Sequence, residues 1–177
     1  MRKILIKLYH FAILYTRGGV AYARKLGVKV GSNSRIYTTN FGSEPFLINL
    51  GDNVVVTSGV KFLTHDGSAC LVRNNKGRRY LYAPIEIGNN VFIGVNSIIM
   101  PGVKIEDNVI VAAGSVVTKS IRAEQVVGGV PAKILGNFVD FKQKVLNSYI
   151  SDADLNLTLP YKERVLSVVT RDHKPFL

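Results

Sequence analysis

Aliphatic residues recur at every sixth position along the stretch from Ile87 to Ile121. Read in sixes, this stretch gives IGNNVF, IGVNSI, IMPGVK, IEDNVI, VAAGSV and VTKSI. The first position of each unit is aliphatic: Ile87, Ile93, Ile99, Ile105, Val111 and Val117. Small or β-branched residues follow four places later: Val91, Ser97, Val103, Val109 and Ser115. A helix would show a period of about 3.6 and a single strand a period of about 2. A period of six indicates a short strand and a turn, repeated around a parallel β-helix.

The same spacing recurs before this stretch, with one interruption. Three units make a triangular coil of about 18 residues whose aliphatic side chains point to the axis, with coils about 4.8 Å apart. The earlier in-phase positions are Val30, Ile36, Leu50, Val56 and Phe62. Ile36 and Leu50 lie two residues further apart than two repeats, which predicts a small insertion around Thr38 to Phe46. The alternative, an ordinary β-rich domain with Val and Ile strands, is disfavoured by six consecutive positions in phase.

A second interruption follows Leu63-Thr64-His65-Asp66-Gly67, after which the period is absent until Ile85. We interpret residues 66–84 as a loop extruded from the coil. Its chemistry-bearing side chains are Arg73, Lys76, Arg78, Arg79, Tyr80 and Tyr82. A loop of this length in a compact repeat is more often functional than idle.

The first 27 residues are predicted to form a helical cap. Met1 to Leu26 fits a helix that Gly27 ends, and its apolar face consists of Ile4, Leu5, Leu8, Phe11, Ala12 and Tyr15. We favour a cap over the open end of the β-helix; the alternative is a helix that binds a partner or a membrane surface. A secretory signal is a third interpretation, but Lys7, His10 and Arg17 interrupt that pattern.

The chain after the repeats reads as a helical tail. The motif Gly128-Gly129-Val130-Pro131-Ala132-Lys133 closes the repeats. Residues 138–149 suit an amphipathic helix and residues 161–169 a second, which we expect to cover or brace the end of the β-helix. The domain boundaries are therefore 1–27 for the cap, 28–136 for the β-helix and 137–177 for the tail.

Composition and charge narrow the class of protein. The 177 residues, 47% of them hydrophobic with a mean hydropathy of +0.18, suffice for one domain. The single cysteine, Cys70, excludes an intramolecular disulfide framework. No apolar run is long enough to span a membrane. We expect a cytoplasmic protein, with the inner face of the membrane as an alternative site.

The net charge of +11 indicates an anionic partner, such as an acidic polysaccharide, an anionic membrane or a phosphate-rich cofactor. No recognisable nucleic-acid-binding module is present, so we expect no nucleic-acid partner.

Together these motifs resemble the hexapeptide-repeat acyltransferases, in the branch of maltose, galactoside and polysaccharide O-acetyltransferases. The resemblance covers roughly Val28 to Leu135 and includes the in-phase repeats, the Thr64 to Gly67 motif before the loop, and the closing Gly129 to Lys133 motif. It implies an all-β fold, a left-handed parallel β-helix with an N-terminal helix and a C-terminal helical tail. It also implies a homotrimer with acetyl-coenzyme A sites between subunits.

Acetyl transfer from a thioester to a hydroxyl needs a base. His10 lies in the N-terminal helix and His173 in the tail, so only His65 lies where a coil meets the loop. By resemblance, His65 is the general base. Its partner is either the adjacent Asp66 or Glu44, 21 residues earlier, and we favour Glu44 because a coil of 18 plus the insertion would bring it beneath His65. Asn40 is a candidate for orienting acceptor or donor.

The remaining site residues concern the two substrates. By resemblance, acetyl-coenzyme A contacts come from positions Phe92, Val95, Ala113, Thr118, Lys119 and Lys133. Related proteins often have tryptophan in place of Phe92 and arginine in place of Lys133. The loop residues assigned to the acceptor are Arg73, Arg78, Arg79 and Tyr82. No metal is expected.

Four functions follow from the sequence, in order of preference. The first is O-acetylation of a sugar or glycan, and the second is N-acetylation of an amino-sugar nucleotide. The third is inactivation of an antibiotic, and the fourth is an inactive scaffold. A γ-class carbonic anhydrase would need three histidines from the coils, which this sequence does not supply.

Overall fold

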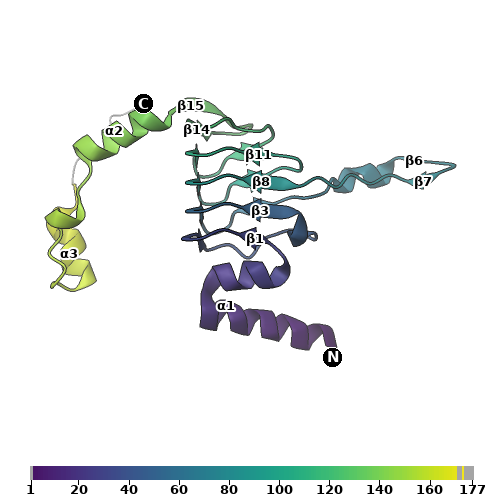
Figure 1. The fold of residues 1–177 in the computed structure, drawn as a ribbon, viewed down its shortest axis with the longest axis horizontal. Coiled ribbons are helices and arrows are strands. Elements are labelled where there is room, and N and C mark those ends of the chain that lie inside the picture. Colours follow the sequence, from purple (N-terminus) through teal and green to yellow (C-terminus); the bar gives the residue numbers. More distant parts are fainter. Residues whose placement is uncertain (1, 171–172, 174–177) are drawn as a thin grey trace. The chain divides into compact units, whose positions relative to one another are not determined.

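The computed structural model describes residues 2–170 and residue 173. The chain forms two compact units, residues 1–139 and residues 140–177, which are described separately. The first unit contains a stack of short parallel strands with a helix at one end and a long hairpin at one side (Figure 1).

The strands form the three faces of a prism, joined by turns at its corners. The four-stranded face has the order β1 (Lys29–Val30), β3 (Ile48–Leu50), β8 (Ile85–Ile87) and β11 (Lys104–Ile105). The six-stranded face has the order β2 (Arg35–Ile36), β4 (Val55–Val56), β9 (Phe92–Ile93), β12 (Ile110–Val111), β14 (Gln125–Gly128) and β15 (Lys133–Asn137). The three-stranded face has the order β5 (Lys61–Phe62), β10 (Ile98–Ile99) and β13 (Val116–Val117). All pairs on these faces are parallel except β14 with β15.

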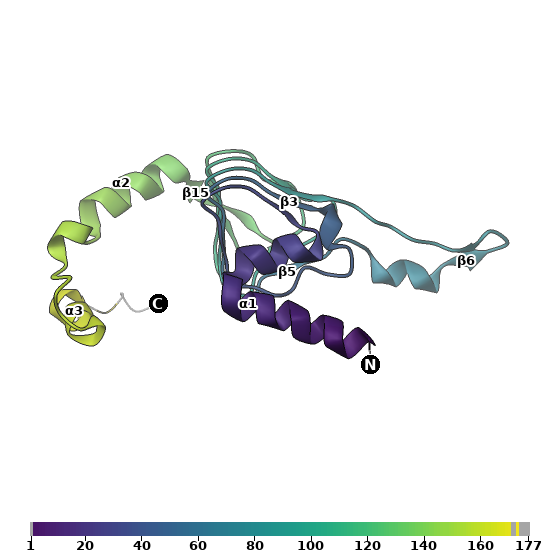
Figure 2. The same ribbon diagram turned by 60° about the horizontal axis from the view of Figure 1, so that its bottom comes forward.

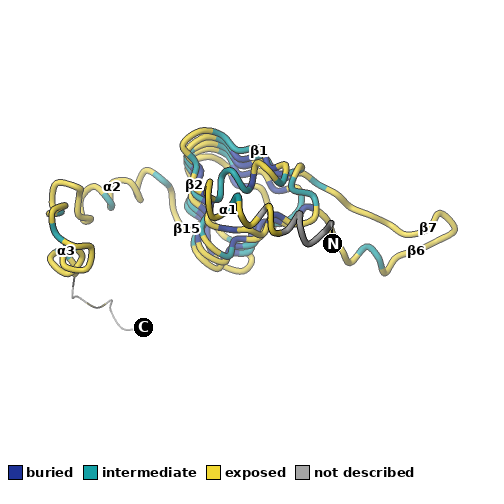
Figure 3. The backbone as a smooth tube through the Cα atoms, turned by 90° about the horizontal axis from the view of Figure 1, so that it is seen from below, coloured by how far each residue is buried: buried dark blue, intermediate teal, exposed yellow. Residues whose placement is uncertain are grey.

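The six-residue period sets the core. Residues 18 positions apart face each other in consecutive coils, as in the pairs Ile87 with Ile105 and Ile93 with Val111. All six aliphatic positions of the repeat are buried, and so are the five positions that follow them by four. The buried residues line the inside of the coils as a continuous column (Figure 3). The predicted repeat and its inward-facing positions are therefore confirmed.

Asparagines hold one corner of the prism. Asn53, Asn90 and Asn108 adopt left-handed backbone conformations, which asparagine tolerates better than most residues. Their side chains form a ladder: Asn53 donates to Asn90 at 2.9 Å and Asn90 donates to Asn108 at 2.6 Å. The repeated turn therefore has its own side-chain support in addition to the backbone hydrogen bonds between coils.

The N-terminal helix α1 (Arg2–Leu26) bends at Gly18, whose backbone is not helical. Only the part after the bend closes the β-helix, where Ala23 is fully buried and Val20, Tyr22 and Leu26 pack against the core. As expected, Gly27 ends the helix. Of the apolar face predicted to form the cap, Leu8, Phe11, Ala12 and Tyr15 are exposed instead. That part of the prediction was wrong, because the bend turns the first half of α1 away from the coils (Figure 2). The side chains of Ile4 and Leu5, also predicted for this face, lie outside the described residues.

Both predicted interruptions have structure of their own. The first contains the 3-10 helix η1 (Pro45–Leu47). The second, the extruded segment, begins with the 3-10 helix η2 (Gly67–Leu71). It continues as an antiparallel pair of strands, β6 (Arg73–Asn74) and β7 (Gly77–Arg78). This hairpin extends outwards from the coils and is almost wholly exposed (Figures 1 and 3).

The tail is helical at the predicted places. Helix α2 (Phe138–Ser148) is followed by the 3-10 helix η3 (Asp152–Asp154) and helix α3 (Tyr161–Val168). With these helices and α1, the fold is not strictly all-β, since the tail and cap contribute most of the helical residues. The expectation that the tail braces the β-helix stays a prediction. No helix in the described part of the chain is long and apolar enough to cross a bilayer.

Candidate active site

The candidate site lies at the corner where the three-stranded face ends and the hairpin leaves the coils. Strand β5 leads directly into Thr64 and His65, and Glu44 comes from the insertion in the preceding coil. The Glu44 Oε2 atom lies 2.9 Å from His65 Nδ1 and accepts a hydrogen bond of 2.7 Å from the Thr64 hydroxyl. The His65 side chain is 41% exposed and that of Glu44 is 17% exposed. The structure thus brings together His65, the predicted base, and Glu44, the partner that the sequence favoured.

Two donors converge on the Glu44 carboxylate. The Thr64 hydroxyl, and after it the His65 ring, lower the pKa of Glu44 from its ordinary value of 4.5. Glu44 is therefore ionised at neutral pH and can only accept hydrogen bonds. This assigns the proton of a neutral His65 ring to Nδ1 and leaves Nε2 as the acceptor. A histidine held in this way can take a proton from a hydroxyl group.

Asp66 has another partner. Its carboxylate accepts hydrogen bonds from the Ser68 backbone at 2.9 Å and from the Ser68 hydroxyl at 2.6 Å. These contacts cap η2 and lower the pKa of Asp66, with the Ser68 hydroxyl as the main cause. Asp66 therefore shapes the start of the hairpin, and the hydrogen bond to His65 belongs to Glu44.

Aromatic and basic side chains of the hairpin form a row that ends at His65. The Tyr82 ring centroid lies 6.3 Å from that of His65, and Tyr80 stacks on Tyr82 at 6.1 Å. The Arg78 guanidinium lies over the Tyr80 ring, 4.7 Å from its centroid. Among the predicted acceptor residues, Tyr82 and Arg78 thus belong to one connected row. Tyr80 was missed as a site residue, although its spacing of two from Tyr82 in an extended segment could have indicated a shared face.

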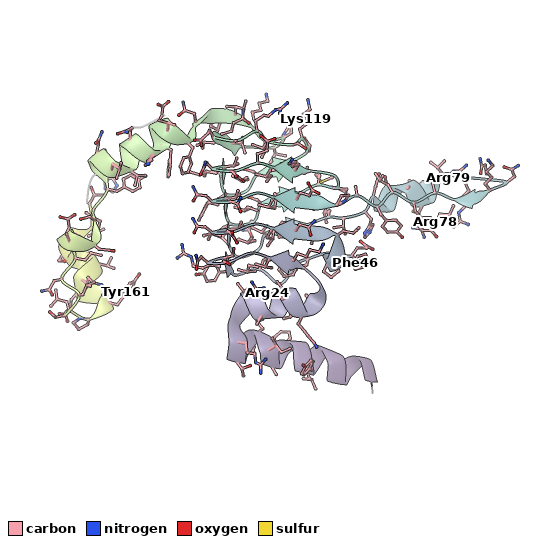
Figure 4. All side chains as sticks on the ribbon, viewed as in Figure 1. Arg24, Phe46, Arg78, Arg79, Lys119 and Tyr161 are labelled. Atoms are coloured by element: carbon pink, nitrogen blue, oxygen red, sulfur yellow. The ribbon has the colours of Figure 1, made fainter. Side chains whose placement is uncertain are left out.

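The other predicted hairpin residues lie further from His65. Arg73 pairs with Arg78 across the two short strands, and Arg79 follows Arg78. All three arginines are exposed, and Figure 4 shows Arg78 and Arg79 on the hairpin, well away from the coils. The hairpin therefore presents positive charge at its outer part and aromatic rings near His65.

Asn40 lies on the three-stranded face. Its backbone pairs with Lys61 in parallel, so it stands one coil below β5. Residues 39–42 and 61–63 line a cleft of about 320 Å³. Lys61 faces outwards there while its neighbour Phe62 is buried. Lys61 was not among the predicted site residues but lines this cleft, and its position directly before the in-phase core residue Phe62 could have indicated that it faces outwards.

Most of the predicted donor-binding residues border the same face. Val95 and Ala113 lie at one corner, where the Gly114 backbone donates to the Val95 carbonyl at 2.7 Å. Thr118 and Lys119 follow β13 at the opposite corner, two coils from Thr64 and His65 in the order β5, β10, β13. Lys119 is exposed on the side of the coils from which the hairpin leaves (Figure 4).

The last two predicted donor residues differ in placement. Lys133 begins β15 and is exposed; Ala132, directly before it, donates to the Val116 carbonyl at 2.9 Å at the end of the three-stranded face. Phe92 instead points outwards from the six-stranded face and is 43% exposed. Within one chain the structure therefore separates Phe92 from the other candidates.

The coils leave little room between layers beside these corners. A Cβ atom on Gly94 would come within about 2.4 Å of the Ala113 backbone nitrogen, so glycine is needed for the close stacking there. Ala112, Ala113 and Gly114 place little side-chain volume at this corner. Within residues 2–170 and 173, no group of three or more His, Cys, Asp or Glu side chains could hold a metal ion.

Comparison with known proteins gives consistent relatives. The family described as "Hexapeptide repeat of succinyl-transferase" matches residues 84–119. Protein CapG of Staphylococcus aureus is 44% identical over 151 residues, which cover 84% of this chain and 86% of CapG. The galactoside O-acetyltransferase of Escherichia coli K12 is 35% identical over 116 residues, covering 62% of this chain and 57% of that enzyme.

Solved structures agree with the sequence relatives. A hexapeptide-repeat acetyltransferase of Vibrio cholerae, solved with acetyl-coenzyme A, superposes with a TM-score of 0.56 at 30% identity over 63% of this chain and 61% of that chain. A galactoside acetyltransferase solved with coenzyme A superposes with a TM-score of 0.58 at 25% identity, covering 82% of this chain and 85% of that chain. These neighbours imply that the coils wind in the left-handed sense. The chain belongs to the hexapeptide-repeat acyltransferases.

Proposed function

We propose that the protein transfers an acetyl group from acetyl-coenzyme A to a hydroxyl of a sugar or of a cell-surface polysaccharide precursor, with His65 as the general base. The observation that carries this proposal is the Glu44–His65 pair at 2.9 Å beside the aromatic row of the hairpin. The similarity to galactoside O-acetyltransferases supports a sugar hydroxyl as the acceptor.

The geometry gives His65 a defined role. Its Nδ1–H donates to Glu44, so Nε2 accepts the proton of the acceptor hydroxyl as the oxygen forms a bond to the acetyl carbonyl carbon. Glu44 stabilises the imidazolium that results. When the carbon–sulfur bond breaks, His65 returns the proton to the leaving thiolate, which completes the transfer. We expect a backbone N–H of a neighbouring coil to donate to the oxyanion.

We expect acetyl-coenzyme A to bind along the three-stranded face and its corners. The small residues at Ala113 and Gly114 and the exposed Val95 would let an extended pantetheine chain lie against the backbone at one corner. Lys119 and Lys133 are exposed cations suited to the coenzyme's phosphates. The acetyl group would then reach the corner that carries His65.

The hairpin suits an anionic acceptor. Tyr80 and Tyr82 offer stacked faces against which a sugar ring can pack, and the three arginines supply positive charge beyond them. The net charge of +11 acts in the same direction by attracting acidic glycans. We therefore place the acceptor along the row from Arg78 to His65.

The test is acceptor-dependent release of free thiol from acetyl-coenzyme A, measured against a panel of neutral sugars, acidic sugars and sugar nucleotides. His65→Ala should lower kcat by about 100- to 10,000-fold, because a positioned base contributes that much. His173→Ala is the matched control and should leave the rate unchanged. Thiol release that survives His65→Ala would remove His65 as the base. Failure to bind acetyl-coenzyme A at all would overturn the whole proposal.

A further inference from the structure

The first half of α1 carries an apolar face with no cover from the rest of the unit. Leu8 is 61% exposed, Phe11 56% and Tyr15 80%, and Ala12 between them is exposed as well. These four residues, here named the α1 face, follow helical spacing and lie on one side of the helix. The Phe11 and Tyr15 rings lie 5.8 Å apart, so they form one continuous surface. A face of this kind on a helix is typical of an interaction surface.

The bend at Gly18 creates this exposure. Gly18 has φ 78° and ψ 176°, a conformation that favours glycine, and the helix changes direction there. The half after the bend packs on the end of the β-helix through Val20 and Ala23. The half before it lies beneath the second half, on the side away from the coils, and the Lys25 ammonium lies 5.2 Å from the Tyr9 ring centroid (Figures 1 and 2). The cap is therefore complete without the α1 face, which leaves that face available for another partner.

The charge of the N-terminal segment indicates which kind of partner the α1 face binds. The sequence contains no Asp or Glu before Glu44. In the same segment it has eight basic residues: Arg2, Lys3, Lys7, Arg17, Arg24, Lys25, Lys29 and Arg35. An apolar helix face within a purely basic segment is complementary to a surface that combines hydrocarbon with negative charge. A second copy of this chain, with the same basic segment and a net charge of +11, is electrostatically unfavourable there.

We propose that the α1 face binds the surface of an anionic lipid bilayer, with the helix lying in the headgroup region. Leu8, Phe11 and Tyr15 would enter the boundary of the acyl chains while the basic residues contact anionic headgroups. The contact is peripheral, because no described helix is long and apolar enough to span a bilayer. This binding does not depend on His65 or on acetyl transfer.

The first experiment uses tryptophan fluorescence, since the chain contains no tryptophan. Phe11→Trp supplies a single fluorophore on the α1 face. Its emission should shift to shorter wavelength with phosphatidylcholine vesicles containing phosphatidylglycerol, and not with phosphatidylcholine alone. High salt should reverse the shift by screening the headgroups. Val130→Trp, an exposed position on the turn between β14 and β15 at the other end of the coils, is the control and should not shift.

The second experiment removes the apolar area. The triple variant Leu8→Ser, Phe11→Ser, Tyr15→Ser should reduce the fraction of protein that sediments with anionic vesicles by about tenfold or more. The control replaces two exposed apolar residues elsewhere, Ile134→Ser and Leu135→Ser, and should bind as the original chain does. Thiol release measured with a soluble acceptor should be the same for the triple variant and the original chain, so failure of the membrane contact is distinguishable from failure of the proposed chemistry.

Three results would overturn the proposal. The first is equal binding of the original chain to neutral and anionic vesicles, and the second is undiminished binding of the triple variant. The third is a lower molar mass of the triple variant by sedimentation equilibrium, which would show that the α1 face contacts another copy of the chain.

Discussion

Thr64 is the residue that fixes how Glu44 holds His65. It is fully buried, and its hydroxyl donates at 2.7 Å to the same carboxylate oxygen that lies next to His65 Nδ1. The carboxylate is thereby held from both sides and cannot rotate away from the imidazole without losing a hydrogen bond. If His65 is the base, as we propose, Thr64 is a positioning residue that acts on it through Glu44.

Thr64→Val should reduce the amount of stability that the fold loses at acidic pH. Because the Thr64 hydroxyl is the main cause of the lowered pKa of Glu44, its loss should raise that pKa towards 4.5. A carboxyl group with a lowered folded-state pKa stabilises the fold above its unfolded pKa, and this stabilisation disappears as the pH falls through the folded value. The fall in Tm between about pH 6 and pH 3 should therefore be smaller in the variant. Thermal unfolding over this range measures it.

The control for this prediction is Thr57→Val. The Thr57 hydroxyl donates to the Ile93 carbonyl at 2.7 Å, so the variant also loses one hydrogen bond, worth about 1 kcal/mol, but no carboxylate is involved. Its Tm should decrease by a similar amount at every pH. If Thr64→Val behaves in the same way, the hydroxyl does not control the ionisation of Glu44. A kcat reduced at pH 7 in Thr64→Val alone would agree with the positioning role.

The Glu44–His65 contact could be predicted from the spacing of the two residues in the sequence. A spacing of 21 residues is within one residue of a coil of 18 plus the two-residue insertion, and this arithmetic is independent of side-chain conformation. The contacts of Asp66 depend instead on a local hydrogen bond to Ser68, which competes with any contact to His65. The stacking of Tyr80 likewise depends on the twist of the hairpin. Side-chain partners of this kind could not be predicted from periodicity.

The hairpin should determine whether the protein prefers acidic or neutral acceptors. Arg78→Ala removes a guanidinium that stacks on Tyr80, and with it one positive charge beside the row of rings. We expect KM for a carboxylate- or phosphate-bearing acceptor to rise by about three- to tenfold, with kcat and KM for acetyl-coenzyme A nearly unchanged. A neutral sugar should show no change. Initial rates with paired acidic and neutral acceptors measure the difference.

Arg164→Ala gives a matched comparison. Arg164 lies over the Tyr161 ring at 5.6 Å in the C-terminal unit, so the variant loses the same kind of contact and the same charge elsewhere. It should leave every KM unchanged. An equal rise of KM in both variants would mean that net charge, and not the hairpin, attracts the acceptor. No rise in Arg78→Ala would remove the hairpin from acceptor binding.

Helix α1 is held to the coils by a close approach at Gly19. A Cβ atom there would come within about 1.9 Å of the Ile36 carbonyl oxygen, which belongs to the backbone of β2 and cannot rotate away. Gly19→Ala should therefore displace the cap and destabilise the unit by about 2 kcal/mol, as overpacking does in closely packed sites. Gly136→Ala, where a Cβ would meet nothing within 4 Å, is the control. Equal Tm values for the two variants would contradict this view of the cap.

Elements differed in how well they could be predicted. The coils followed from a repeat that continues through the β-helix, because each inward position is fixed by its neighbours above and below. The two halves of α1 both show helical periodicity, and the pattern does not say which half the coils bury. The decision comes from the fit of Gly19 and Ala23 on the end of the stack and from the bend at Gly18. Such tertiary fit is outside local sequence patterns.

The six-stranded face suggests how whole molecules associate. Val55, Phe92, Ile110 and Val126 are aligned in register and point outwards from consecutive strands. Together they form an apolar column on the outer side of this face, half-buried at Val55, Ile110 and Val126 and exposed at Phe92. If neighbouring subunits of a trimer pack in a head-to-tail ring, this column meets a different face of the next subunit. Phe92 of one subunit could then complete the donor site beside the three-stranded face of another.

Mixing two inactive variants tests this arrangement. His65→Ala lacks the base, and Phe92→Ser lacks the aromatic wall; each should be nearly inactive as a homotrimer. When the two variants are co-expressed in equal amounts, mixed trimers form. A site shared between subunits is then intact where a Phe92→Ser subunit supplies His65 and a neighbouring His65→Ala subunit supplies Phe92. Random assembly makes about a quarter of such sites intact, whereas sites built within one chain are never intact. Thiol release by purified mixed trimers should therefore recover to about a quarter of the original rate. Recovery to no more than the sum of the separate variants would place Phe92 outside the shared site, and the apolar column would need another explanation.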